Sequence, residues 1–503
     1  MFNIFNIKRK GEFILQNTKK LNVFEIESIP KAVATLAIPS VLSMLVTVLY
    51  NMVDTFFVGQ THDPYRMNAV SMATPVFMML MAIGNLFGIG ACAFISRSLG
   101  SGATERVKKI SSFSFWCAVI LGIVATILMT TGVSMLMPLL GADADKNIAT
   151  IGNNITGAEL ERQIENYRNL EKYTKDYLFY IGIGAVPTII SSCFSHMTKG
   201  EGAAKISMFG MIIGSVTNMI LDPIMILALD MGVKGAAIAT TIGNCVSVLF
   251  YFGYLLRKNT ILSISPKQFS IGNGIAAGVI AIGVPTFCTN LLMSFSNIVM
   301  NRFLNNIDIL ATGAMGIAMK ANMLVVFLQM GIGMGIQPLV GYHYGAGNRK
   351  RMSKIMNFSI ICTMIIGITL TAVYFIFTEP LISLFMTEGA SASAEDVSKQ
   401  ISYAVKMLRA LMVSGPFLGI IFVNNFSLQG MGRGISSLLL SISRQGFVFL
   451  PVLILANAWI GLNGLIYAQP IADLISVIIS FFMVWLAKKH MNANKTEKVL
   501  SKC

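Results

Sequence analysis

Two apolar segments in the first half of the chain carry side chains that can hold a cation. Asn51 and Asp54 are three residues apart, and Asn218 and Asp222 are four apart, so on a helix each pair shares one face. A charge inside a membrane-spanning helix costs about 2.5–3.5 kcal/mol on insertion scales, so it usually has a function. Pro223 has no N–H and frees a backbone carbonyl one turn earlier. These oxygen-rich groups predict an ion site.

Two carboxylates held together in a low-dielectric bundle cannot both stay ionised without a partner. Either one of Asp54 and Asp222 takes a proton, or a cation enters between them. Both outcomes couple the protein to an ion, and the residues leave H⁺ and Na⁺ equally open. The structural alternative is that these acids pair with Lys or Arg of neighbouring helices. No basic residue lies well within the first six apolar segments to serve as that partner.

The second half carries deep basic residues instead. Lys320 and Arg444 fall within apolar segments, and Asp473 lies in the last one. One interpretation is that either cation pairs with Asp473 as a structural bridge. The other is that Lys320 or Arg444 contacts anionic groups of a substrate, which would reduce a preference for lipophilic cations.

Composition indicates the elements that must position these residues. The chain has 503 residues, is 54% hydrophobic and is only 12% charged, where soluble chains carry roughly 25% charge. A membrane-spanning helix needs about 20 mostly apolar residues. The sequence predicts twelve such spans: 33–59, 68–98, 108–136, 177–198, 206–229, 233–256, 272–301, 309–342, 355–377, 402–429, 434–457 and 461–487. We therefore expect an all-α integral membrane protein.

The net charge of +15 reflects orientation rather than nucleic-acid binding. Basic residues concentrate in alternate short segments between spans, as the positive-inside rule requires. This pattern places residues 1–31 and 488–503 in the cytoplasm and predicts a multi-pass cell-membrane protein without a cleaved signal peptide. The outside segment 137–176 has the pattern of a short amphipathic helix.

The two halves of the chain repeat each other. The matched pairs are Pro39 with Pro285, Asn51 with Asn297, Gly100 with Gly345, Arg106 with Arg351, and GVKGAAIATTIG (232–243) with GLNGLIYAQPIA (461–472). Six spans per half is an even number, so both halves enter the membrane from the same side and form a parallel repeat. We expect two six-helix bundles related by a pseudo-twofold axis: an N-lobe over 32–260 and a C-lobe over 261–487. Such bundles enclose a central cleft and can rock to give alternating access.

The chain resembles a known transporter family. LYNMVDTFFVG in the first span, GYHYGAGNRKRM after the eighth and GAAIATTIG in the sixth are similar, in order and spacing, to the multidrug and toxic compound extrusion (MATE) transporters. The resemblance covers residues 30–487. It implies a secondary antiporter that exports amphipathic and often cationic compounds, driven by inward H⁺ or Na⁺. We further expect a monomer that needs no cofactor besides the coupling ion.

The DinF-like branch of that family, within the MOP flippase superfamily, implies a cation site in the N-lobe. The residues matching it are Asp54, Asn218, Asp222 and Thr240, which would be the metal ligands if the ion is Na⁺, with Pro39 as the bending proline. Other branches place acids on the seventh and eighth helices, where this chain has none, and Met300 aligns with Asp54. Further supporting or cleft-lining candidates are Asn51, Asn297, Lys320 and Arg444.

Two other functions remain open from the sequence. A lipid-linked oligosaccharide flippase of the same superfamily needs a cationic cleft for a pyrophosphate, and Lys320 and Arg444 are the only deep basic residues, which argues against this function. A membrane scaffold or receptor would use the outside segment 137–176. Four histidines without catalytic spacing argue against an enzyme.

Overall fold

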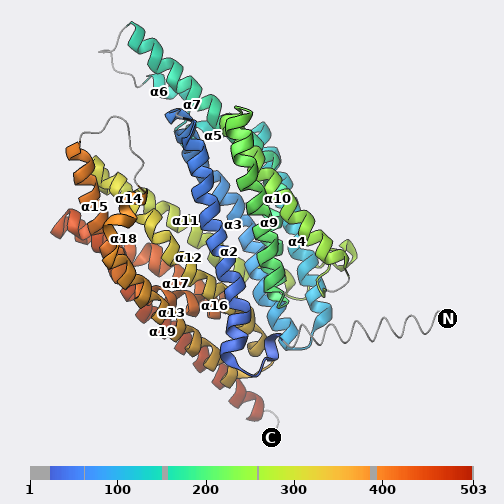
Figure 1. The fold of residues 1–503 in the computed structure, drawn as a ribbon. Coiled ribbons are helices and arrows are strands. Elements are labelled where there is room, and N and C mark those ends of the chain that lie inside the picture. The colour runs from blue at the N-terminus through green and yellow to red at the C-terminus, as the bar shows by residue number, and fades with distance from the viewer. Residues whose placement is uncertain (1–22, 62, 150–156, 258–259, 386–393, 501–503) are drawn as a thin grey trace.

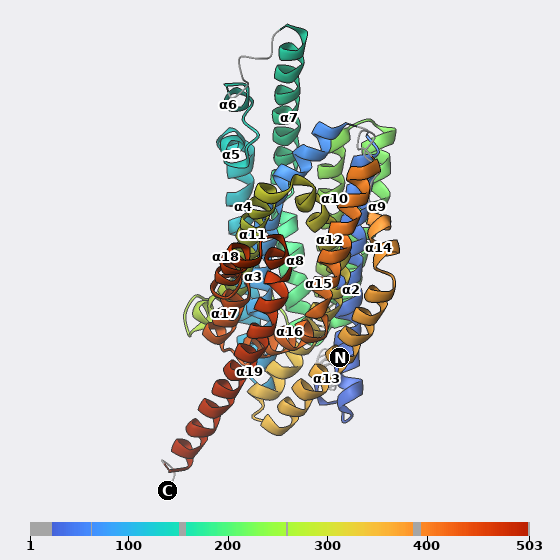
Figure 2. The ribbon, with the colours of Figure 1, turned by 90° about the vertical axis from the view of Figure 1, so that its left-hand side faces the viewer.

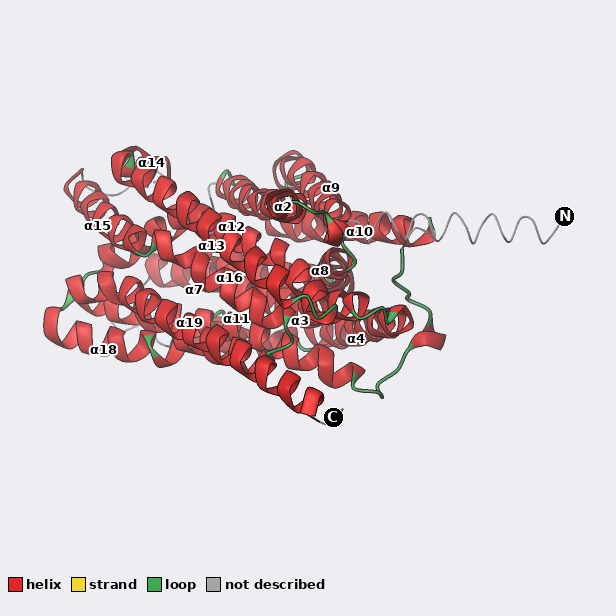
Figure 3. Ribbon diagram, turned by 90° about the horizontal axis from the view of Figure 1, so that it is seen from below, coloured by secondary structure: helices red, strands yellow, loops and turns green. Residues whose placement is uncertain are grey.

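The computed structural model describes residues 23–61, 63–149, 157–257, 260–385 and 394–500, and these residues form helices and their connections without a strand (Figure 3). The predicted all-α fold is confirmed. The first half contains α2 (Ile29–Gly59), α3 (Pro64–Gly100), α4 (Thr104–Thr131), α5 (Val133–Leu140), α6 (Ala144–Ala149), α7 (Ala158–Ile183), α8 (Ala185–Gly200), α9 (Ala204–Asp222), the π-helix η1 (Pro223–Ala228) and α10 (Gly232–Leu256).

The second half follows a short 3₁₀ turn, η2 (Pro266–Gln268). It contains α11 (Ile275–Ile307), α12 (Ile309–Gly345), α13 (Arg349–Ile376), α14 (Thr378–Phe385), α15 (Ala394–Val413), α16 (Gly415–Gly430), α17 (Gly434–Ile442), the π-helix η3 (Ser443–Phe447), α18 (Phe449–Ile460) and α19 (Leu462–Leu500). The basic residues 8–10 and the last three residues lie outside the described ranges.

Twelve predicted spans have counterparts in the structure. Among the described residues, ten helical stretches are long and apolar enough to cross a membrane, and two bent pairs meet the same criterion together. The bent pairs are Glu159–Ile183 with Ala185–Gly200, at 54°, and Val397–Val413 with Gly415–Gly430, at 50°. Each observed span overlaps its predicted range when a bent pair is counted as one crossing. Helices suit this environment because each satisfies its own backbone hydrogen bonds without water.

A proline accompanies each of the two bends. Pro187 has no N–H to donate to the carbonyl of Ile183, which is the residue where α7 ends. Pro416 likewise cannot continue the hydrogen bonding of α15 beyond Val413. The bends therefore follow from the local sequence, and the outer and inner halves of each of these spans run in different directions.

Residues 158–176 of the outside segment are helical, as their pattern predicts, but the helix is longer than expected. α7 runs without interruption from Ala158 through the outside part and into the membrane-spanning part. It continues because no glycine or proline occurs between Ala158 and Gly182 to end it. Figures 1 and 2 show α7 projecting beyond the bundle, with α5 and α6 beside it.

The described helices form two groups that meet at one end. In Figure 1, α2, α4, α9 and α10 gather on one side, and α13, α15, α16 and α19 on the other. Helix α2 begins and α19 ends at the same end of the bundle. One apolar core lies wholly in the second half, between residues 300 and 472. A small cluster of Met44, Ile89, Met334 and Phe426 packs between the halves, and we call it the interlobe cluster.

The contact between the halves is reciprocal. A Cβ built on Gly100 would lie 2.0 Å from the carbonyl oxygen of Tyr342, and a Cβ built on Gly345 would lie 2.1 Å from the carbonyl oxygen of Arg97. Gly100 aligns with Gly345, and Arg97 aligns with Tyr342 at the same offset. A two-fold axis requires such an exchange of equivalent contacts. Small residues let the helices approach this closely, as is common between membrane helices.

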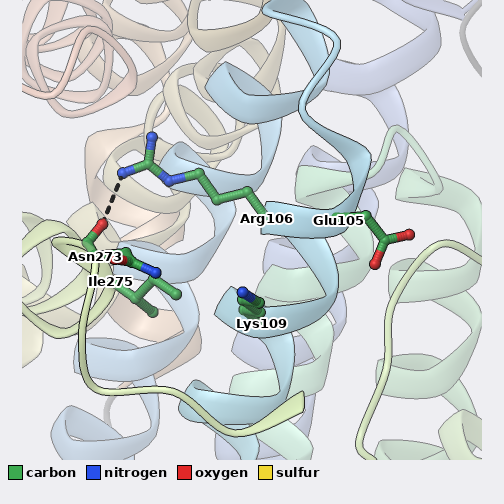
Figure 4. Close-up of a pocket in the computed structure, with 5 residues that line it drawn as sticks. All are labelled: Glu105, Arg106, Lys109, Asn273 and Ile275. Atoms are coloured by element: carbon green, nitrogen blue, oxygen red, sulfur yellow. Dashed lines mark hydrogen bonds between the residues drawn. The ribbon is translucent and has the colours of Figure 1, made fainter.

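Two aligned arginines connect the lobes at the same end of the bundle, and we call them the arginine clasp. The guanidinium of Arg106, on α4, donates to the carbonyl of Asn273 just before α11, at 3.3 Å (Figure 4). The guanidinium of Arg351, on α13, donates to the carbonyl of Ile26 just before α2. An arginine of each lobe thus binds the backbone just before the first helix of the other lobe. A surface hollow of about 330 Å³ lies beside Arg106, lined also by Glu105, Lys109, Asn273 and Ile275 (Figure 4).

Candidate cation site

The structure brings together the N-lobe polar residues that the sequence singles out. Asp222 is 0% exposed, and Asn218 one turn earlier is equally buried. The Nδ2 of Asn218 donates to Asp222 Oδ1 at 3.3 Å and lies 3.2 Å from the hydroxyl of Thr240 on α10. Asn218 and Asp222 therefore share one helix face, as their four-residue spacing predicts. The hydroxyl of Thr240, on a different helix, joins them in one cluster.

Three oxygens at this cluster are buried and accept no hydrogen bond from any described residue. They are Oδ1 of Asp54, Oδ1 of Asn218 and Oδ2 of Asp222. All three are acceptors, so neither of the two carboxylates can satisfy the other. A buried acceptor without a donor costs about 1–3 kcal/mol, and more when it is charged. A proton or a cation is the partner that would satisfy them.

Asp54 approaches the cluster from α2. Its carboxylate interacts electrostatically with Asp222 and with the hydroxyl of Tyr50, which stands one turn earlier on the same helix. The Tyr50 hydroxyl lies 3.4 Å from the hydroxyl of Thr240. Helices α2, α9 and α10 therefore all contribute oxygens to one location.

The cluster continues as a hydrogen-bonded network to α8. The Nδ2 of Asn244, one turn after Thr240, donates to the backbone carbonyl of Thr240 and to the hydroxyl of Thr188, both at 3.1 Å. The hydroxyl of Ser191 donates to Asn244 Oδ1 at 3.2 Å. This network holds α10 against α8, so the position of Thr240 is determined by two helices.

Oxygen is the ligand atom that all these groups offer. Carboxylate, amide and hydroxyl oxygens suit hard cations, whereas transition metals prefer imidazole or thiolate. Within the described ranges, no group of three or more His, Cys, Asp or Glu side chains is placed to hold a metal ion. The set of two carboxylates, one amide and one hydroxyl fits a proton or a monovalent cation.

Comparison with known proteins identifies the family. The model of the MatE family matches residues 39–224 and 285–455, which is most of the chain. This chain belongs to the MatE family. Both matched stretches begin at the aligned prolines, Pro39 and Pro285, so the family's unit occurs once in each half of the repeat. The resemblance to MATE transporters is confirmed, while membership of the DinF-like branch stays a prediction.

Relatives of this MatE protein are named multidrug exporters. The "Multidrug export protein MepA" of Staphylococcus saprophyticus is 29% identical over 479 residues, covering 95% of this chain and 98% of the relative. The protein of the same name from Staphylococcus aureus is 28% identical, covering 96% of this chain and 99% of the relative.

Solved structures share the fold. One is the outward-facing conformation of a multidrug resistance MATE family transporter of the MOP superfamily, with a TM-score of 0.82, 23% identity, and coverage of 94% of this chain and 98% of the other. Another is a MOP superfamily transporter from Pyrococcus furiosus, described as having a binding pocket of reverse polarity. It has a TM-score of 0.82 at 24% identity and covers 95% of this chain and 99% of the other. At these identities the likeness establishes the two-bundle fold of the MatE protein.

Other predicted site residues of the MatE chain lie outside the cluster. The Asn51 amide donates to the carbonyl of Thr47 on its own helix, at 2.8 Å. Pro39 is buried, but α2 runs as one continuous helix from Ile29 to Gly59 through it. The side chain of Asn297, on α11, has no hydrogen-bond partner within the part of the chain that the structure describes. Supporting roles for these residues stay predictions.

The C-lobe of the MatE chain has no equivalent pair of carboxylates. Met300, which aligns with Asp54, is buried in the apolar core of the second half. Of the two deep cations, Arg444 pairs with Asp473 at 2.8 Å, whereas Lys320 is exposed and has no ion-pair partner among the described residues. The asymmetry between the lobes predicted from the sequence is therefore visible in the side-chain contacts.

Tyr50, Tyr177 and Asn244 belong to the site environment, although the sequence did not single them out. Tyr177 on α7 is buried and interacts electrostatically with Asp54, Tyr50 and Asp222. Helical spacing could have found Tyr50 and Asn244, because each stands one turn from a predicted ligand. No local signal could have found Tyr177, since the fold of α7 brings it there.

Proposed function

We propose that this MatE protein is a secondary antiporter that exports amphipathic, drug-like compounds in exchange for inward H⁺ or Na⁺. The observation that carries the proposal is the set of three buried acceptor oxygens on Asp54, Asn218 and Asp222 that have no donor. Such a set binds a positive charge reversibly, since an unsatisfied carboxylate in a low-dielectric bundle gains from a proton or a cation. The names of the relatives support a multidrug substrate range.

Ion binding in this mechanism acts on α2. When Asp54 and Asp222 are both ionised, their repulsion favours separating α2 from α9. A proton or Na⁺ removes that repulsion and favours a closer approach, so the ion changes the position of a helix that also contacts the other lobe through α12. Gly335 of α12 packs so closely on α2 that a Cβ there would lie 2.5 Å from the Cα of Ala37. A movement of α2 is in this way transmitted to the C-lobe.

Alternating access is part of the proposal. The two lobes meet at one end through the reciprocal glycine contacts and the arginine clasp. Opening that end requires both sets of contacts to separate together, and the two-fold relation makes such a movement a rigid-body rotation of one lobe against the other. The compound itself undergoes no chemical conversion.

The test uses purified protein in vesicles with H⁺ and Na⁺ gradients imposed separately. We expect export of a fluorescent amphipathic cation under one gradient, and its loss in Asp54→Asn. Asp230→Asn is the matched control, because Asp230 is an exposed acid of the same lobe, 3.5 Å from Arg66. Undiminished gradient-driven export in Asp54→Asn would overturn the proposal, as would transport that neither gradient drives.

The lipid-linked oligosaccharide flippase is the less favoured function. It requires several cations for the multiple negative charges of a pyrophosphate, whereas the C-lobe ion pair offers one guanidinium, on Arg444, that Asp473 already contacts. A vesicle assay that compares the fluorescent cation with a lipid-linked sugar separates the two functions. A scaffold or receptor function of the outside segment is tested by deleting that segment, which we expect to leave transport intact.

We further propose that both termini are cytoplasmic and that the protein works as a monomer. The distribution of basic residues supports the orientation. Protease access to tags at each terminus in right-side-out vesicles tests it, and access from outside would contradict it. Light scattering of the purified protein gives the oligomeric state.

A further inference from the structure

The C-lobe contains an ion pair between two membrane spans, and the antiport mechanism does not use it. Asp473 on α19 is 1% exposed, and each of its oxygens has a protein partner. Oδ1 accepts from Arg444 Nε at 2.8 Å and from the Gln469 amide at 2.9 Å, and Oδ2 accepts from the Ser414 hydroxyl at 3.0 Å. Asp473 is thereby satisfied completely as a carboxylate.

Arg444 is not satisfied in the same way. It uses Nε for Asp473, and no described residue accepts a hydrogen bond from either of its terminal nitrogens. Its side chain is 16% exposed, so these nitrogens remain reachable. Guanidinium groups present planar donors that match carboxylate, sulfonate and phosphate oxygens. Asp473 therefore orients a guanidinium whose outer donors are free to bind another anion.

The surroundings place this guanidinium on the side where the lobes meet. Its central carbon lies 5.3 Å from the ring centroid of Phe422. Phe422 in turn packs against the interlobe cluster, together with Met330 of α12 and Met211 of α9. Flexible methionine and aromatic side chains adapt to varied apolar shapes. A cation thus stands beside an apolar surface that both lobes build.

The internal repeat gives the pair a counterpart. Asp473 aligns with Asn244, and Gln469 aligns with Thr240. In the N-lobe, the Thr240 hydroxyl contacts the Asn218 amide, which also bonds Asp222. In the C-lobe, Gln469 and Arg444 both bond Asp473. The two halves therefore place different groups at related positions: carboxylates without donors in the N-lobe, and a guanidinium oriented by a carboxylate in the C-lobe.

A purely structural role explains the pair less well. A buried ion pair is often no more stable than a well-packed apolar pair of similar volume, and charges within spans are usually functional. Arg444 also lies in η3, a π-helical turn, and such turns are frequent at functional sites. A structural bridge gives no reason to leave the terminal nitrogens without acceptors.

We propose that Arg444, oriented by Asp473, binds the anionic group of the exported compound, and that Phe422 contacts its apolar part. This inference rests on the proposed export function and names its substrate class: amphipathic compounds that carry a carboxylate or sulfonate, including zwitterions. The ligand of this site has an anionic group attached to an apolar body, and the coupling ion binds separately at the N-lobe carboxylates.

The experiment measures binding of rhodamine B, a zwitterion, and of its methyl ester, a cation, to the purified full-length protein. We expect wild type to prefer the carboxylate roughly tenfold, about 1.4 kcal/mol. In the double variant Arg444→Gln/Asp473→Asn the ratio should fall to about one, with ester binding retained. Removing both charges leaves no lone buried charge, so the variant should fold. Arg302→Gln, at an exposed arginine of the same lobe, is the matched control.

The inference is overturned if wild type shows no preference for the carboxylate, or if the double variant keeps the wild-type preference. Equal loss of both ligands in a well-folded double variant also overturns it, because it would show a structural role. Arg444→Lys should give an intermediate ratio, since it keeps the charge and loses the planar fork. If vesicle export fails for both dyes, the proposed function fails, while the binding ratio still decides the role of Arg444.

Discussion

Replacing Asp222 by Asn should stabilise the ion-free protein and remove its response to the coupling ion. Asp222 Oδ2, Asp54 Oδ1 and Asn218 Oδ1 are buried acceptors without donors. The new amide supplies N–H donors to this group, so one or more of those oxygens gains a partner. A buried unsatisfied acceptor costs about 1–3 kcal/mol, which makes a gain of that size the expected effect without ion.

The same substitution should weaken ion binding strongly. A carboxylate attracts a monovalent cation about 4 Å away by about 4 kcal/mol at an effective dielectric constant near 20. That corresponds to roughly a thousandfold in the dissociation constant. The amide oxygen remains a ligand, so this factor is an upper bound. At a concentration of about 100 times the wild-type constant, the ion adds about 2.7 kcal/mol to wild type and should add almost nothing to the variant.

Thermal unfolding in detergent measures both effects. Melting temperatures are compared in NaCl and in choline chloride at one alkaline pH, and then across a downward pH series, so that Na⁺ and H⁺ are tested separately. Asp230→Asn controls for the loss of one acid in the N-lobe. An Asp222→Asn protein that responds to Na⁺ and H⁺ as wild type does, or that melts below wild type without ion, would refute the reasoning.

Three further predictions concern the contacts between and within the lobes. Gly100→Ala should hinder closure of the lobe interface by about 1–3 kcal/mol, because its Cβ would lie 2.0 Å from a carbonyl oxygen; spin-label distances between the lobes should lengthen at that end, and unchanged distances would contradict it. Arg106→Ala and Arg351→Ala should each weaken the same closure by about 1.5–3 kcal/mol, the size of a hydrogen bond to a charged group. The spin-label distances between the lobes should lengthen in both variants, and shorter distances in either one would contradict a role of the arginine clasp in closure. Asp308 accepts a hydrogen bond from Lys399 at 2.8 Å, and this contact lowers the pKa of Asp308 below 3.8. The ionised Asp308 therefore stabilises the fold above pH 3.8, and the stabilisation is lost as the pH falls through the lower pKa of the folded state. Asp308→Asn should flatten the acid limb of a plot of unfolding free energy against pH.

The spans and the repeat were predictable because they depend on local composition. Apolar runs long enough for a bilayer predict crossings directly, and the matched glycines and prolines of the two halves follow from alignment alone. The four-residue spacing of Asn218 and Asp222 also predicted their contact, since helical geometry places them on one face. The continuity of α7 was missed because the length of its outer, polar part carries no apolar signal of a span.

The sequence by itself determined the membrane class, the twelve crossings, the parallel repeat and the acids of the N-lobe. Only the tertiary structure decided that Tyr177 stands beside those acids, that Arg444 rather than Lys320 pairs with Asp473, and that the arginine clasp joins the lobes. The physical reason is that membrane helices are apolar both toward lipid and toward one another, so periodicity does not reveal which faces meet. Those faces are selected by close approaches at glycines such as Gly100 and Gly345, which act between segments far apart in the chain.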